Sequence, residues 1–432
     1  ENDGVLPLAE GQRIAYIGEF AAKPRYQGGG SSHINASRVV SAVDAASAKG
    51  RVFAYAKGFS AERDEMSEEE LQEALRTASE ADVAVVFAGL PDVFESESYD
   101  RSSMKLPECQ NRLIEEVLKV QPRVVVVLHN GSPVETPWAD RVSAVLELYL
   151  GGQGVGKACD RLLYGEANPC GRLAETFPLR LEDNPSYLHF PGNGKRVSYG
   201  EDIYVGYRYY DTKHLPVRWA FGHGLSYTEF AYDNLTLSSE QMKDGDVVTV
   251  SVDVKNVGAK TGKEVVQLYV GDKSGTAERP VKELKGFAKV ELSPGEQKTV
   301  SFELSARDLS YYETEIMDWY APAGTYEIQV GHASDDIRLS GEITFTTKRE
   351  LPLVVTNTTT LGELLRHPKT QAAVTELLAP MTRASEQDAV PEAYKTLMQK
   401  VLEEMPLRSL ISVMPGEQVD MLISQMNALC AQ

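Results

Sequence analysis

Four carboxylates and an arginine crowd into one short stretch of the chain, residues 89–101. The acidic residues are Asp92, Glu95, Glu97 and Asp100, and Arg101 follows them directly. Carboxylates held close together raise one another's pKa, and a carboxyl group that keeps its proton near neutral pH can act as a general acid. The stretch is therefore a candidate site for acid/base catalysis, although a solvated acidic loop has the same composition.

A glycine-rich loop, residues 25–32, is the second candidate. Its glycines, Gly28, Gly29 and Gly30, have no Cβ and let a ligand approach the backbone closely. The loop lacks the G-x-G-x-x-G order with a helix directly behind it, and it lacks the lysine of the G-x-x-x-x-G-K-[ST] pattern. These absences disfavour nucleotide binding.

Two other segments combine a histidine with hydroxyl or aromatic residues. In His129-Asn-Gly-Ser132 the histidine lies near a serine, but no G-x-S-x-G elbow is present, so a structural turn is favoured over a nucleophile. The segment Phe221–Tyr227 surrounds His223 with glycines and aromatic residues. It is expected to be a packed junction between domains.

The elements that must position these loops are indicated by short apolar runs. Buried strands are predicted at 14–17, 52–55, 83–87, 124–128 and 144–148, with amphipathic helices between them. Alternating strands and helices indicate a mostly parallel α/β sheet. Ligands of such sheets collect at the carboxyl ends of the strands, which directs attention to the residues that follow the 83–87 run.

The periodicity then changes along the chain. From Val247 apolar residues alternate with polar ones, and turn sequences such as Ser293-Pro-Gly295 separate the runs, which predicts a β-sandwich. After Pro352 the apolar spacing is helical again, with one stripe that includes Leu397, Val401 and Leu402. We therefore expect an α/β domain at 1–230, a sandwich at 231–348 and a helical extension at 349–432.

The composition excludes several function classes. Forty-four basic and sixty-three acidic residues give a formal charge of −19, which disfavours nucleic acid and anionic lipid as partners. The four cysteines show no spacing suited to a metal, so neither a metal site nor a cofactor is expected. No apolar stretch reaches the length of a membrane span and no signal peptide opens the chain, so a cytoplasmic location is expected.

Five motifs in the same order resemble those of the family 3 glycoside hydrolases, chiefly the bacterial β-glucosidases. The motifs are Tyr26-Gln-Gly-Gly-Gly-Ser-Ser32, Glu97-Ser-Tyr-Asp-Arg101, His129-Asn-Gly-Ser-Pro-Val-Glu135, Gly171-Arg-Leu-Ala-Glu-Thr-Phe-Pro178 and Phe221-Gly-His-Gly-Leu-Ser-Tyr227. The resemblance runs from residue 1 to about 348 and, more weakly, into the helical tail. It implies an α/β sandwich followed by a fibronectin type III-like domain.

The resemblance also implies roles for particular residues. Family members are retaining enzymes with an aspartate nucleophile on a preceding TIM-like barrel and a glutamate acid/base on the second domain. Glu97 matches that glutamate, with Glu95 as a competing candidate, and Ser98 replaces the family's usual glycine, which implies a somewhat different loop backbone. The loop that contains Tyr26, Ser31 and Ser32 matches the border of the aglycone subsite. Some members have an aromatic platform where this chain has Ser31.

The chain itself contains no barrel, and Val5-Leu-Pro-Leu8 resembles the linker that follows one. We therefore expect part of a retaining β-glucosidase that acts on a β-glucoside or oligosaccharide and is inactive without a barrel domain or subunit. The alternatives are a β-xylosidase or other exo-β-glycosidase of the family, and a non-catalytic carbohydrate-binding or scaffolding subunit. Homo-oligomerisation stays open.

Overall fold

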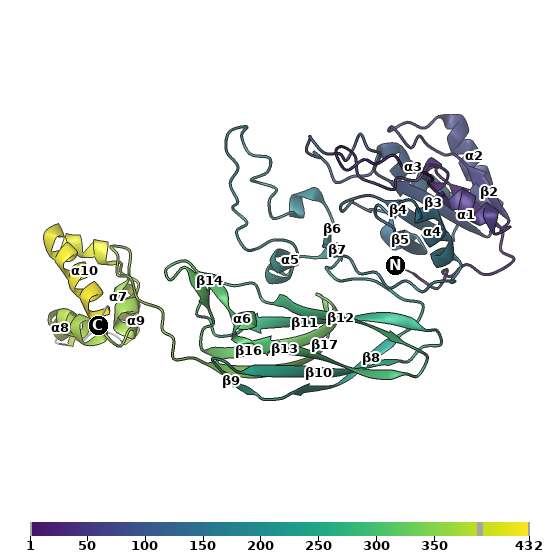
Figure 1. Ribbon diagram of the computed structural model, residues 1–432. Helices are drawn as coiled ribbons and strands as arrows, with labels where there is room; N and C mark the ends of the chain where they lie inside the picture. Colours follow the sequence, from purple (N-terminus) through teal and green to yellow (C-terminus); the bar gives the residue numbers. More distant parts are fainter. Residues whose placement is uncertain (1, 387–391, 431–432) are drawn as a thin grey trace. The chain divides into compact units, whose positions relative to one another are not determined.

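The computed structural model describes residues 2–386 and 392–430. The chain divides into two compact units, of which the first comprises Glu1–Leu309 and Pro322–Thr346 and the second comprises Ser310–Ala321 and Thr347–Gln432. The first unit holds an α/β domain and a β-sandwich, and the second holds a short hairpin and a group of helices (Figure 1).

The sheet of the α/β domain has five parallel strands in the order β2-β1-β3-β4-β5 (Figure 1). The strands are β1 (Ile14–Ile17), β2 (Phe53–Ala56), β3 (Val83–Gly89), β4 (Val124–His129) and β5 (Ala144–Glu147). β3 and β4 are buried along their whole length, as expected of central strands covered on both faces. The predicted positions of the strands are confirmed, but the run at 52–55 is not buried as predicted: Val52 precedes the edge strand β2 and is 84% exposed, and Ala54 and Tyr55 within β2 are exposed as well, because an edge strand has a neighbour on one side only.

Two pairs of helices cover this sheet. They are α1 (Ala42–Ala48) beside α4 (Val155–Leu163), and α2 (Glu68–Ser79) beside α3 (Glu108–Val120). The chain moves from β1 to β2 in one direction and from β2 to β3 in the other, so right-handed crossovers place the two pairs on opposite faces. The capping box predicted at the start of α2 is present, with Ser67 Oγ accepting from the Glu70 amide and the Glu70 carboxylate accepting from the Ser67 amide.

Two sheets form the sandwich, one in the order β13-β10-β8 and the other in the order β12-β11-β16-β17-β9. Their strands are β8 (Phe230–Leu237), β9 (Gln241–Lys243), β10 (Val247–Asn256), β11 (Gly262–Asp272), β12 (Glu283–Leu292), β13 (Gln297–Ser305), β16 (Gly324–Ala333) and β17 (Asp336–Thr346). In β10 every second residue is buried, which is the period that predicted the strand. A one-turn helix, α6 (Ala306–Leu309), follows β13.

A connecting segment lies between the sheet and the sandwich. It contains β6 (Phe177–Pro178), α5 (Tyr207–Lys213) and β7 (Val217–Trp219), with 3-10 turns η2 (Ala139–Arg141) and η3 (Leu181–Asp183) before and within it. The Phe221–Tyr227 segment bonds in both directions: the Leu173 amide donates to the His223 carbonyl and the Ser334 amide donates to the Phe221 carbonyl. The segment therefore bonds both to the connecting segment and to the residues after β16, although Leu225 is 45% exposed.

The second unit contains the hairpin β14 (Tyr311–Glu313) and β15 (Asp318–Tyr320) and the C-terminal helices. The helices are α7 (Leu361–Arg366), α8 (Gln371–Glu386), α9 (Glu392–Glu403), η4 (Leu407–Ser412) and α10 (Gly416–Cys430). Val419, Leu422 and Met426 of α10 pack into its core. The apolar stripe predicted on α9 is only partly buried, because Leu402 packs against that core while Leu397 and Val401 are exposed.

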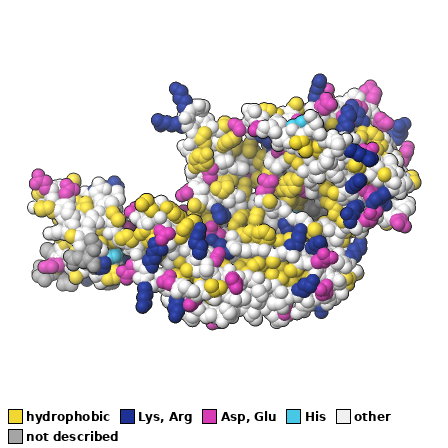
Figure 2. Space-filling model, in the orientation of Figure 1, with side chains coloured by type: hydrophobic (Ala, Val, Ile, Leu, Met, Phe, Trp, Pro, Cys, Tyr) yellow, Lys and Arg dark blue, Asp and Glu magenta, His cyan; other side chains and the backbone are white. Residues whose placement is uncertain are grey.

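Acidic and basic side chains are mixed over the visible face of the molecule (Figure 2). Among residues 2–386 and 392–430, no helix has the length and apolar character needed to cross a bilayer. All four cysteines are unpaired.

Candidate active site

The acidic loop and the glycine-rich loop meet where the strand order of the sheet reverses. β1 is flanked by β2 on one side and by β3 on the other, and the chain crosses between these neighbours in opposite directions. The loops that leave the carboxyl ends of β1 and β3 therefore lie at the edge of the sheet where ligands of open α/β sheets usually bind. A parallel bridge between Gly29 and Ser96 joins the two loops there.

Glu97 is exposed and lies against the glycine-rich loop. Its carboxylate accepts a hydrogen bond of 2.5 Å from the Ser31 amide, and its own amide donates to the Gly29 carbonyl at 3.4 Å. Gly30 has φ +91°, and a Cβ built there would lie 2.4 Å from the Glu97 Cβ. Only glycine fits this position without displacing Glu97. Hydrogen bonding from Ser31 holds the pKa of Glu97 below its usual range.

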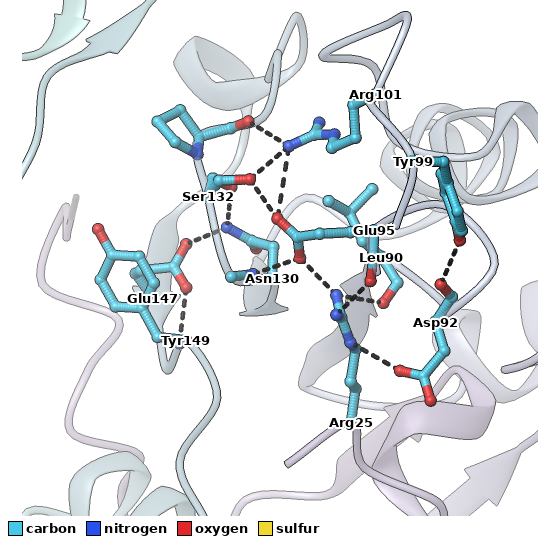
Figure 3. Close-up of polar contacts among 12 residues, drawn as sticks. Arg25, Leu90, Asp92, Glu95, Tyr99, Arg101, Asn130, Ser132, Glu147 and Tyr149 are labelled. Atoms are coloured by element: carbon cyan, nitrogen blue, oxygen red, sulfur yellow. Dashed lines mark hydrogen bonds and ion pairs between the residues drawn. The ribbon is translucent and has the colours of Figure 1, made fainter. Parts of the chain in front are cut away.

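Glu95, the competing candidate, has both carboxylate oxygens bonded to residues of neighbouring segments (Figure 3). Its Oε2 accepts from Arg25 Nη1 at 2.5 Å and from the Gly131 amide at 2.7 Å, and its Oε1 accepts from the Ser132 hydroxyl. Burial pushes the pKa of Glu95 upward, but the hydrogen bonds from Ser132, Gly131 and Arg25 outweigh it and the net shift is downward. Glu95 is thus an ionised carboxylate whose oxygens are already occupied by the protein.

The other predicted site residues surround Glu97 unevenly. Ser31 and Ser32 are exposed, and Ser31 contacts Glu97 through its amide. Tyr26 is half-buried; its hydroxyl accepts from Gln27 and its carbonyl accepts from the Gly152 amide in the loop after β5. Ser98 has φ +81°, in the region that favours glycine, so serine here holds a backbone conformation suited to glycine.

The His129–Ser132 segment is a turn with a supporting role. His129 is 2% exposed, its ring lies near those of Phe20 and Phe87, and burial lowers its pKa to about 4. It is therefore a neutral core residue and not a base. The next residues, through the Gly131 amide and the Ser132 hydroxyl, bind Glu95 and so hold the acidic loop.

A second carboxylate lies behind this turn (Figure 3). Glu147, at the end of β5, accepts from the Tyr149 amide at 2.7 Å and from Asn130 Nδ2 at 3.2 Å. Burial raises the pKa of Glu147 to about 8 in spite of these bonds, and the carboxylates of Glu175 and Glu95 add to the rise. Nothing in the sequence singles out this group, because a single glutamate at the end of an apolar run is ordinary.

Replacing Glu147 with glutamine is expected to stabilise the chain at alkaline pH. The raised pKa means that the folded chain binds more protons than the unfolded chain between about pH 4.5 and 8, so wild-type stability falls as the pH rises through that window. Glutamine does not ionise, so the variant avoids this loss, and its gain over the wild type reaches at most about 5 kcal/mol at the upper end of the window. Melting temperatures measured across the window test this, with exposed Glu10→Gln as control; a gain that does not depend on pH contradicts it.

A cavity of about 480 Å³ borders β5, but Glu97 does not line it. Its lining is mainly apolar and includes Val145, Leu146, Trp219 and Leu225, together with Glu147. A sugar presents hydroxyl groups that need hydrogen-bonding partners, so an apolar cavity suits it poorly. The exposed surface around Glu97, where the two loops meet, is the better candidate for the chemistry.

The comparisons with known proteins agree with this architecture. Residues 1–227 match the glycosyl hydrolase family 3 C-terminal domain, and residues 264–334 match the fibronectin type III-like domain. The thermostable beta-glucosidase B of Acetivibrio thermocellus is 46% identical across 98% of this chain and 57% of its own length. The exo-alpha-(1->6)-L-arabinopyranosidase of Bifidobacterium longum is 37% identical across 95% of this chain and 54% of its own.

A solved beta-glucosidase of family 3 from Bifidobacterium adolescentis has the same fold. It superposes with a TM-score of 0.80 at 38% identity, over 87% of this chain and 55% of that one. The chain thus spans about half the length of the relatives that it matches. Because a family model matches more than half of its residues and a close relative matches nearly all of them, this chain belongs to glycoside hydrolase family 3.

Proposed function

We propose that this chain is the part of a retaining β-glucosidase that supplies the general acid/base, Glu97. The observation that supports this most directly is the contrast between the two glutamates of the loop. Glu95 has both oxygens occupied by Arg25, Gly131 and Ser132, whereas Glu97 is exposed and its carboxylate is bonded by Ser31. An acid that must meet a glycosidic oxygen has to be accessible.

In the proposed reaction an aspartate on a barrel attacks the anomeric carbon while protonated Glu97 gives its proton to the departing oxygen. Glu97, now ionised, then removes a proton from the water that releases glucose. Retaining enzymes place the two carboxyl groups roughly 5 to 5.5 Å apart. The lowered pKa of Glu97 must rise for the first step, and burial of its carboxyl group under the barrel and the sugar would raise it.

The chain alone is expected to be inactive, because a retaining mechanism needs a second carboxylate as nucleophile. The test combines the purified chain with a family 3 barrel and follows hydrolysis of cellobiose and of aryl β-D-glucosides, xylosides and α-L-arabinopyranosides. We expect hydrolysis only in the mixture, fastest on glucosides, with β-glucose as the first anomer seen by proton NMR.

Two results would change this assignment. A stable complex of chain and barrel without any turnover would favour the non-catalytic scaffolding subunit. Faster cleavage of the xyloside or the arabinopyranoside would assign another exo-glycosidase. Several sugars are compared because the relatives include both a beta-glucosidase and an exo-alpha-(1->6)-L-arabinopyranosidase.

A further inference from the structure

Arg25 is a buried cation with an unusually complete set of partners in the acidic loop (Figure 3). Its side chain is 5% exposed. Nε donates to Asp92 Oδ1 at 3.0 Å, Nη1 donates to the Leu90 carbonyl at 3.1 Å and to Glu95 Oε2 at 2.5 Å, and Nη2 donates to the Glu95 carbonyl at 2.7 Å. Three nitrogens thus hold two carboxylates and two backbone carbonyls of one loop.

The loop is fixed again on the far side of Glu97. Arg101 Nη1 donates to the Ser132 hydroxyl at 2.6 Å and lies 3.6 Å from Glu95 Oε1. Ser132 in turn donates to Glu95, so Glu95 is shared between the two arginines. Glu97 lies between these anchors, on a stretch with few other supports: its own amide bond to Gly29 is long, at 3.4 Å.

Arg25 also belongs to the segment that contacts Glu97 directly. It lies four residues before Gly29 and six before Ser31, which are the residues that bond the backbone and the carboxylate of Glu97. A movement of Arg25 would therefore displace the acid/base loop and the glycine-rich loop relative to each other.

From these contacts, and resting on the proposed role of Glu97, we propose that Arg25 is a positioning residue that sets where the Glu97 carboxyl meets the glycosidic oxygen. A lysine cannot replace it. The guanidinium is planar and presents donors in several fixed directions, whereas an ammonium group is a point charge on a flexible stem that cannot reach all four acceptors at once. Arg25→Lys keeps the charge and loses the geometry.

The test asks whether the loss of kcat/KM caused by Arg25→Lys depends on the leaving group. It is measured in the enzyme formed by this chain and its barrel. Cellobiose needs a proton from the acid, and dinitrophenyl glucoside does not. Because a displacement of about 1 Å can cost about 100-fold in rate, Arg25→Lys is expected to lower kcat/KM about 100-fold on cellobiose. On the dinitrophenyl substrate the loss should stay under about 10-fold, since only positioning of the acid is impaired.

Arg51→Lys is the matched control. Arg51 also pairs with two carboxylates, those of Asp160 and Glu166, and its side chain is 18% exposed, but it lies on a different part of the domain. A general loss of stability would affect this variant as well and would lower kcat/KM equally on both substrates. Asp92→Asn is a second, milder variant, because it removes the negative charge of one partner of Arg25, a side chain that is 59% exposed, and keeps an oxygen that can accept from Nε. This variant should also lose more activity on cellobiose than on dinitrophenyl glucoside, with kcat/KM on cellobiose falling about 5-fold.

Glu97→Ala, measured alongside, separates the two proposals. If Glu97→Ala lowers kcat/KM equally on the two substrates, the proposed role of Glu97 is wrong. If Glu97→Ala loses more activity on cellobiose than on dinitrophenyl glucoside and neither Arg25→Lys nor Asp92→Asn does so, only the positioning role of Arg25 is overturned. Hydrogen exchange on the chain by itself gives an independent check. Amides in 94–101 and Gly131 should exchange at least 10-fold faster in Arg25→Lys, and unchanged exchange there would also overturn the inference.

Discussion

Glu97→Ala, in the enzyme formed with the barrel, is expected to lower kcat/KM on cellobiose by 100- to 10,000-fold, the usual range of about 10² to 10⁴ for loss of a general acid. On dinitrophenyl glucoside kcat/KM should change by less than about 10-fold, because dinitrophenolate leaves without a proton. The physical basis is the accessible position of Glu97 beside the glycine-rich loop, where Ser31 bonds its carboxylate.

The second step of the reaction, hydrolysis of the glycosyl-enzyme, provides a second test of the role of Glu97. Without Glu97 no base activates the water, so the glycosyl-enzyme should accumulate with the dinitrophenyl substrate, and both kcat and KM should fall. A small anion such as azide needs no base and should restore kcat. Glu95→Gln is the comparison, because it leaves Glu97 in place and removes the negative charge that Arg25 and Arg101 share. Losses of equal size on both substrates for Glu97→Ala would sink the assignment.

Arg172→Ala is expected to destabilise the first unit by about 3 to 5 kcal/mol, the cost of leaving a buried charge without its partner. Arg172 Nη2 lies 2.9 Å from Glu264 Oε2, and the Glu264 side chain is completely buried on β11. Tyr232 and His332 also bond Glu264, at 2.8 and 2.7 Å, but neither brings a permanent positive charge. The midpoint of urea unfolding, followed by circular dichroism, measures the loss.

The pH dependence of that loss has a defined sign. Burial raises the pKa of Glu264, but the bond with His332 and the charge of Arg172 outweigh it, and the net shift is downward. Stability from this pair is therefore present above about pH 4.3 and is lost as the pH falls through the lowered pKa. Arg13→Ala breaks the exposed pair with Asp82 and should leave the midpoint of urea unfolding almost unchanged, because solvent screens exposed ion pairs. An equally small effect of Arg172→Ala would contradict the prediction.

Much of the fold could be predicted because its signals are local. Apolar runs marked the five strands, a serine and a glutamate three residues apart marked the start of α2, and alternation marked the sandwich strands. Each of these patterns is read within one element. The exposure of Leu397 and Val401 on α9 shows the limit of this reasoning, since an apolar stripe predicts a helix but does not supply the surface that covers it.

The site was only partly predictable. The sequence pointed to the 89–101 loop and, through the family motif, to Glu97, whose catalytic role stays a prediction. It did not point to Arg25 or Ser132 as supports, nor to the raised pKa of Glu147.

By itself, the sequence determined the elements, their order along the chain and the acidic loop as the place to look. The tertiary structure decided which glutamate is held and which is accessible. Glu95 and Glu97 are two residues apart and identical in type, so no local property separates them. They differ because the sheet places β1 beside β3, which brings Arg25 to Glu95 across 70 residues and brings the Ser31 amide to Glu97 across 66. Electrostatic and hydrogen-bonding partners act over a few ångströms, and only the folded chain determines which groups lie within that range.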